Sequence, residues 1–177
     1  MKIRKVCLVS LMVGIFLGCL TFSTVHAQDM SIWVGKWFKL TVKYSGYSTN
    51  DSGIISSNKE TNVNYLKIWN VNEANKVVSF YSYNEDDQWR GESVDFRYTG
   101  GNSLDFLIYY FECEGEDLHY CFGFTGRIQG KMKGGILTSA TIKSLGGFEW
   151  SAPRGAAGVT VTGSLIPESK LPPGIPK

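Results

Sequence analysis

Residues able to carry acid–base or nucleophilic chemistry are few in this chain, and most of them lie in predicted turns. The 177-residue sequence holds two histidines and four cysteines. His26 falls in a predicted leader, and His119 falls in a predicted turn, where an exposed side chain is the simplest interpretation. A Ser-His-Asp triad would have to use that turn residue, and a site with several imidazoles is excluded. We therefore predict no catalytic residue, no metal and no cofactor.

Carboxylates are the other candidates, because glycoside hydrolysis needs only two suitably placed acidic side chains. The acidic runs at 86–87 and 114–117 lie in predicted turns, where solvated charges are expected. Glu112 differs, since alternation places it on the same strand face as Phe106 and Tyr110. We interpret Glu112 as a carboxylate that lines the mouth of the fold, with a catalytic acid as the alternative.

The two cysteines outside the leader are spaced for a disulfide. Pairing of 104–113 with 119–129 as a hairpin sets Cys113 opposite Cys121. Zinc binding is disfavoured, because the spacing of the pair matches no usual zinc motif. We predict a Cys113–Cys121 disulfide whose short loop limits its contribution to the low end of roughly 2–4 kcal/mol.

Residues 1–27 have the parts of a secretory signal peptide. A basic start is followed by an uncharged stretch at 6–22 and by a small-x-small pattern that ends at Ala27. We predict cleavage after Ala27 and a secreted or periplasmic location. The alternatives are an uncleaved anchor and a lipid anchor on Cys19, which Gly18 precedes.

Removal of the leader changes the charge balance of the chain. The full sequence has 18 basic and 16 acidic residues, and the leader contributes three of the basic ones and none of the acidic ones. The remaining residues therefore carry a net charge near −1, with both signs interspersed. Such a surface does not favour nucleic acid or an anionic membrane. We predict one domain with no nucleic-acid partner and no transmembrane segment after processing.

Apolar and polar residues alternate with a period of two through most of the chain after the leader. From Phe38 to Ser45 the even positions are apolar and the odd positions are polar. Short turn signals such as Gly134-Gly135 separate eight such segments. We predict an all-β fold, an eight-stranded antiparallel up-and-down barrel, with a β-sandwich as the alternative.

The predicted barrel domain covers residues 28–166 and includes one long loop. Residues 46–62 are rich in Ser, Asn and Gly, which predicts a mobile loop after the first strand. Residues 167–177 are rich in proline and are expected to form an extended, mobile tail. Several strands carry aromatic residues on both faces, which indicates an exposed platform or a wall covered by residues 46–62 and 146–158.

The segment Gly35-Lys36-Trp37, at the start of the first predicted strand, resembles the Gly-x-Trp signature of lipocalins and their calycin relatives. The resemblance extends to the long first loop and to the up-and-down strand order. It implies a barrel whose floor is closed by Trp37 and whose mouth holds a small apolar ligand. The chain lacks the C-terminal helix that lipocalins pack on the barrel.

The inward positions and this resemblance together suggest a binding protein. We predict that a small apolar or amphipathic ligand is bound without catalysis. The alternatives are a structural or interaction protein of the cell envelope with a filled barrel core and, less favoured, a barrel isomerase or hydrolase that uses Glu112 or His119. The predicted ligand-binding residues are Trp37, Phe38, Leu40, Tyr44, Phe106, Tyr110, Glu112 and Phe124.

Processing at the predicted site would leave Gln28 as the first residue of the protein. Intact-mass spectrometry of protein recovered from the medium or envelope of expressing cells should give the mass of residues 28–177. A Cys19→Ser substitution should leave that mass unchanged, because the position is removed. A product that begins at Cys19 and carries acyl chains would contradict cleavage after Ala27.

Overall fold

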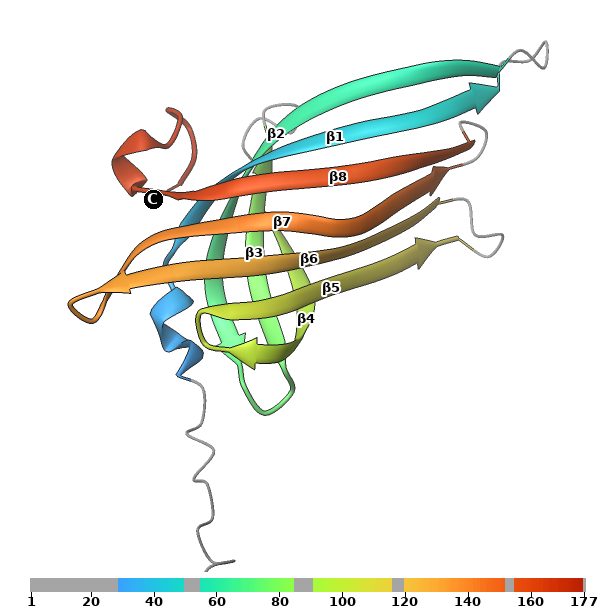
Figure 1. The fold of residues 1–177 in the computed structure, drawn as a ribbon. Coiled ribbons are helices and arrows are strands. Elements are labelled where there is room, and N and C mark those ends of the chain that lie inside the picture. The colour runs from blue at the N-terminus through green and yellow to red at the C-terminus, as the bar shows by residue number, and fades with distance from the viewer. Residues whose placement is uncertain (1–28, 50–54, 85–90, 116–119, 152–154, 177) are drawn as a thin grey trace, which may run out of the picture.

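The computed structural model describes residues 29–49, 55–84, 91–115, 120–151 and 155–176 (Figure 1). The predicted leader, Cys19 and His119 lie outside these residues. The described elements are η1 (Met30–Trp33), β1 (Trp37–Thr49), β2 (Ile55–Asn72), β3 (Val77–Asn84), β4 (Glu92–Asn102), β5 (Asp105–Glu114), β6 (Tyr120–Lys133), β7 (Ile136–Ser151), β8 (Gly155–Ile166) and η2 (Glu168–Lys170). Among them, no helix is both long enough and apolar enough to cross a membrane.

The eight strands form a closed antiparallel barrel in which each strand pairs with the next one in the chain. β1 pairs on one side with β2 and on the other with β8, so that Phe38 lies between Leu66 and Leu165. Closure leaves no strand edge without a partner, which is how up-and-down barrels avoid edge-to-edge association. The predicted barrel is confirmed, and the β-sandwich is excluded.

Alternation along the strands sorts side chains to the two faces of the wall. On β1, Phe38, Leu40 and Val42 are buried in the main core, whereas Lys39 and Lys43 are exposed. The same alternation holds along β5 and β6. A period of two in sequence becomes an apolar interior and a polar exterior, because successive Cβ atoms of a strand point to opposite faces.

One end of the barrel is closed by η1, near the turns that join β2 to β3 and β4 to β5 (Figure 1). Trp33 is fully buried and packs on Phe38 and Phe106, with ring centroids 6.2 and 5.5 Å apart. Its indole N–H donates to the carbonyl oxygen of Ser103 at 2.6 Å. The Asp29 side chain caps the start of η1 by accepting from the backbone N–H of Ser31. Trp33 therefore forms the floor of the barrel.

Trp37, which the Gly-x-Trp resemblance implies as the floor residue, lies on the outer face instead. Phe38 already faces inward, so its neighbour in the strand must face outward. Trp37 packs in a second, outer cluster with Tyr65, Tyr83 and Ile175. Its ring centroid is 5.6 Å from that of Tyr83, and the Lys67 ammonium lies 5.2 Å from its ring.

The C-terminal residues cover this outer cluster and do not project as the extended segment that their prolines predict. Residues 168–170 form a short 3-10 turn, and Ile175 is only 5% exposed against the outer aromatic rings. Leu171 packs against the same cluster. Burial of these apolar side chains offsets the entropy lost on ordering the tail, which proline reduces by restricting the unfolded chain. The outward rings of Trp37, Tyr65 and Tyr83 are therefore covered by the C-terminus rather than by residues 46–62 or 146–158. Other outward aromatic residues, such as Trp69 and Tyr109, stay exposed.

Most of the long loop expected at 46–62 is strand instead, and its residues 50–54 lie outside the described residues. β1 continues to Thr49 and β2 begins at Ile55, with unbroken pairing between them. Residues 146–151 and 155–158 likewise belong to β7 and β8. Backbone pairing depends on tertiary context more than on side-chain type, so a ribbon of Ser, Asn and Gly can extend a sheet despite weak strand propensity.

The predicted disulfide is confirmed. Cys113 of β5 lies directly opposite Cys121 of β6, and their sulfurs are bonded. The bond ties two strands together at the end of the barrel away from η1, next to the inward-facing Glu112.

The floor position of Trp33 predicts a large difference between two tryptophan variants. Trp33→Ala should lower the free energy of unfolding by about 3–5 kcal/mol, because it leaves a cavity in the packed end and an unpaired Ser103 carbonyl. Trp69→Ala is the matched control, since Trp69 is 42% exposed on the outer face and should cost at most about 1 kcal/mol. Urea denaturation of both variants measures the difference. Equal losses would contradict the floor role of Trp33.

Candidate functional site

The half of the barrel away from η1 is hollow. A cavity of about 220 Å³ lies inside it, open toward the end where β1 finishes and β2 begins. Apolar residues from seven strands line its deeper part: Leu40, Val42, Leu66, Val94, Ile108, Phe124, Ile142 and Val161. The barrel is therefore solid at one end and open to a small molecule at the other.

Glycines in the wall help to create this space. A Cβ at Gly126 would lie 2.5 Å from the Phe124 ring, and one at Gly163 would lie 2.2 Å from the Leu40 side chain. Phe124 can therefore lie flat along its own strand, and Leu40 against the neighbouring strand β8, instead of filling the centre. An eight-stranded barrel is barely wide enough to be filled by its own side chains, so such displacement of inward residues toward the wall leaves a void.

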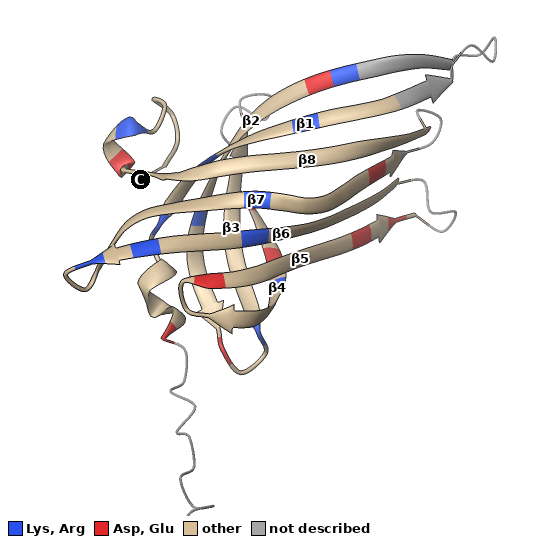
Figure 2. Ribbon diagram, viewed as in Figure 1, with Lys and Arg blue, Asp and Glu red and all other residues tan. Residues whose placement is uncertain are grey.

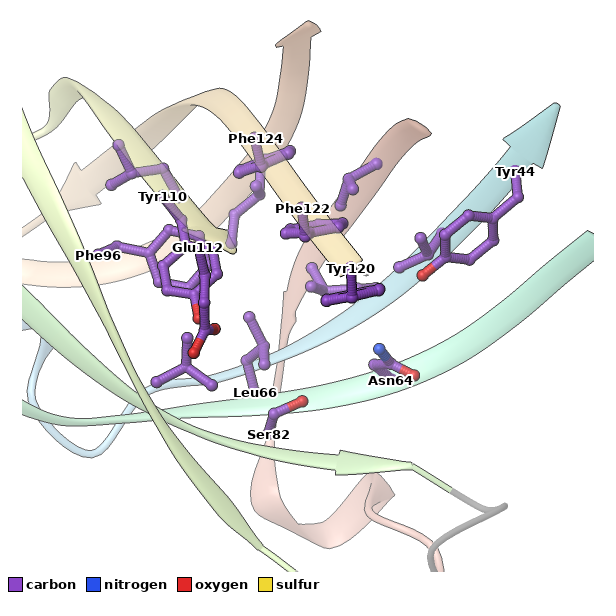
Figure 3. A pocket seen from close by; sticks show the side chains of 16 residues that line it. Tyr44, Asn64, Leu66, Ser82, Phe96, Tyr110, Glu112, Tyr120, Phe122 and Phe124 are labelled. Carbon is purple, nitrogen blue, oxygen red and sulfur yellow. The ribbon is translucent and has the colours of Figure 1, made fainter. Parts of the chain in front are cut away.

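Burial falls stepwise along β5 toward the mouth of the cavity. On β5, Ile108 is 1% exposed, Tyr110 is half-buried and Glu112 is exposed, although all three share the inward face. The polar side chains of the cavity include Tyr44, Asn64, Ser82, Glu112 and Tyr120 (Figure 3). The site thus combines an apolar base with a polar mouth.

The electrostatics of the mouth are set by two tyrosines and their acidic neighbours. Burial raises the pKa of Tyr44 to about 12, with further contributions from the charges of Glu149 and Glu60. Burial likewise raises the pKa of Tyr120 to about 12, with Glu149 the next contributor. Both phenols are therefore neutral at physiological pH and can donate or accept a hydrogen bond at the mouth.

The structure brings together five of the eight predicted ligand-binding residues. Phe38 and Phe106 lie in the packed end against Trp33, and Trp37 lies on the outer face. The residues that line the cavity as predicted are Leu40, Tyr44, Tyr110, Glu112 and Phe124. Binding by these residues stays a prediction.

Other cavity residues were not predicted. Val42 and Val161 share the inward parity of predicted neighbours, so the alternation could have identified them. Asn64, Ser82 and Tyr120 could not be assigned in this way, because their place at the mouth depends on the register of β2, β3 and β6 with neighbouring strands.

The cavity offers little for catalysis in the described part of the chain. Glu112 lines it, but its carboxylate makes no hydrogen bond or ion pair to another described residue. The described residues contain no group of three or more His, Cys, Asp or Glu side chains that could hold a metal ion. The arrangement is suited to holding a molecule by burial, hydrogen bonds and charge.

A second concave surface lies on the outer wall. Phe111 of β5 and Phe148 of β7 flank Gly123, with their ring centroids 6.2 Å apart, and Tyr109 lies beside them. Phe111 is 67% exposed and Phe148 is 44% exposed. A Cβ at Gly123 would lie 2.4 Å from the Phe148 ring, so the missing side chain allows that ring to rest on the strand.

Comparison of the chain with models of known protein families finds no match, and a search of curated protein sequences finds none either.

The raised pKa values of Tyr44 and Tyr120 predict loss of stability in the alkaline range. An unfolded tyrosine titrates near pH 10, whereas these two titrate at about 12 in the folded protein. The folded state therefore holds protons that the unfolded state releases, and the stability linked to them is complete below pH 10 and is lost as the pH rises toward 12. Denaturation midpoints across this range should fall less steeply for Tyr44→Phe and Tyr120→Phe than for the parent. Parallel curves would contradict the link.

Proposed function

We propose that this protein is an exported β-barrel that binds a small apolar or amphipathic molecule in its open half and does not transform it. The observation that carries the proposal is the contrast within one barrel between a packed end, closed by Trp33, and a cavity of about 220 Å³. A barrel that served only as a rigid scaffold would gain stability from filling that space.

The size and lining of the cavity support a small ligand. Drug-sized ligands occupy pockets of roughly 300–1,000 Å³, so this smaller cavity, which is open at one end, suits one short chain or two to three rings. The apolar base supplies burial, and the tyrosine and asparagine side chains at the mouth supply orientation. The lipocalin-like arrangement, a barrel with one closed end and one open end, is in keeping with this function.

Export is supported by two independent features. The first 27 residues have the pattern of a signal peptide. The Cys113–Cys121 disulfide is of a kind that persists in oxidising compartments. We propose a secreted or periplasmic protein, with lipid attachment at Cys19 as the alternative.

The outer aromatic surface favours a second candidate function. Phe111, Phe148 and Leu145 are large apolar residues that are 67%, 44% and 61% exposed on neighbouring parts of one wall. Exposed apolar groups gathered in this way mark interaction sites more often than isolated ones do. An interaction protein of the cell envelope would use this wall, and its barrel cavity would then be incidental.

A neutral fluorescent dye, N-phenyl-1-naphthylamine, distinguishes the two surfaces. The parent protein should enhance its fluorescence, and Val161→Trp should reduce the affinity at least about tenfold by filling the cavity. Thr162→Trp is the matched control, because it adds the same ring one residue away on the outer face and should leave the affinity unchanged.

Circular dichroism would verify that both variants remain folded. Undiminished dye binding by folded Val161→Trp would contradict binding in the cavity. Loss of binding only on Phe111→Ser would assign the dye to the outer wall and favour the interaction function.

Native mass spectrometry of the protein purified from the envelope of the cells that naturally produce it should show a bound small molecule.

A further inference from the structure

Charged side chains are segregated by sign between the two faces of the barrel wall. Strand register and alternation place five acidic residues on the inward side near the mouth: Glu60, Glu92, Glu112, Glu114 and Glu149. No lysine or arginine among the described residues lines the cavity. Figure 2 shows red segments near the ends of β5 and β7 at the open end, and one red segment farther along β2 beside a blue one.

The outward positions of the same strands carry mostly the opposite charge. Basic residues on this face are Lys39, Lys43, Lys59, Lys67, Arg97, Arg127, Lys131, Lys133 and Lys143, whereas Asp95 and Asp105 are acidic. Asp105 is already paired, since Arg127 donates to it through two hydrogen bonds of 2.6 and 2.7 Å. The chain after the leader is close to neutral, so the acidic mouth reflects where the charges are placed and not an excess of acid.

Aromatic rings line the same part of the cavity as the carboxylate of Glu112. Tyr44, Tyr110, Tyr120 and Phe122 contribute side chains between the apolar base and the mouth (Figure 3). The face of an aromatic ring attracts a cation through its quadrupole, most strongly where water is partly excluded. Carboxylate and ring therefore favour the same sign of charge in a ligand.

The raised pKa values of Tyr44 and Tyr120 reflect the same negative charge at the mouth. After burial, the largest contributor to the raised pKa of Tyr44 is the negative charge of Glu149, followed by that of Glu60. For Tyr120, Glu112 and Glu114 also contribute. Acidic residues from three strands thus act on the hydroxyl groups at the mouth.

We propose that the ligand of this cavity is a cationic amphiphile, a molecule with a short apolar chain or ring system and a protonated amine or quaternary ammonium head. The inference rests on the binding function proposed above and specifies its ligand class. The apolar part would lie between Leu40, Ile108 and Val161, and the head would lie at the mouth beside Glu112 and the ring of Tyr120. A carboxylate or phosphate head would meet the glutamates and be repelled.

Three molecules with the same eight-carbon chain test the proposal: n-octylamine, n-octanol and n-octanoate at neutral pH. Each would compete with N-phenyl-1-naphthylamine for the processed protein. The amine should displace the dye at a concentration at least about tenfold lower than octanoate, and lower than octanol. Added sodium chloride should reduce the difference between the concentrations at which the amine and octanol displace the dye, because salt screens exposed charges.

Two variants with the same change in net charge locate the effect. Glu112→Gln should reduce the preference for the amine over octanol several-fold, measured as the ratio of the concentrations at which each displaces the dye. Asp95→Asn is the matched control, since it removes one negative charge from the outer face of β4 and should leave all three affinities as they are.

The outcomes separate this inference from the function on which it rests. Displacement by all three molecules at similar concentrations, or preference for octanoate, would overturn the cationic ligand and leave small-molecule binding intact. Failure of the dye and of all three molecules to bind would overturn both. A preference for the amine that is insensitive to Glu112→Gln, or equally sensitive to Asp95→Asn, would overturn recognition by the inward carboxylate.

Discussion

The backbone ladder between β1 and β8 joins the first strand of the barrel to the last, and it limits the space that the inward side chains share. Residues 37–46 pair with 157–166 in continuous register, while β2 pairs along the other side of β1. An eight-stranded barrel closed in this way has an interior that its own side chains can just fill. Where those side chains lie then decides whether the molecule is solid or hollow.

The packing inside this barrel is unequal along its axis. At one end η1 inserts Trp33 between Phe38 and Phe106, and these packed rings fill the barrel interior there. Toward the other end, wall glycines such as Gly126 and Gly163 let large side chains lie flat, and the centre stays open. A single closed sheet therefore provides a rigid base and a binding cavity, and the base fixes the positions of the strands that shape the cavity.

The two faces of the barrel wall differ in charge because successive side chains of a strand point to opposite faces. Alternation sends glutamates inward near the mouth and most lysines and arginines outward, so a nearly neutral chain has a cavity with an acidic entrance. On β1–β3 the outward face carries Trp37, Tyr65 and Tyr83, and the C-terminal residues bury these rings. On β5–β7 the outward rings stay exposed, which makes the outer wall itself asymmetric.

The sequence by itself determined the fold class, the strand order, the disulfide and the inward placement of residues such as Leu40, Tyr110 and Glu112, because a period of two and short turns are local properties of the chain. Only the tertiary structure decided which tryptophan closes the floor, since Trp33 and Trp37 are both near the first strand and their roles depend on what each meets across the barrel. It also decided that the C-terminal residues pack on the outer face of the barrel and that residues 46–49 and 55–62 form strand. It placed the side chains of Asn64 and Tyr120 at the mouth of the cavity. These features depend on register and on contacts between distant residues, which no local pattern encodes.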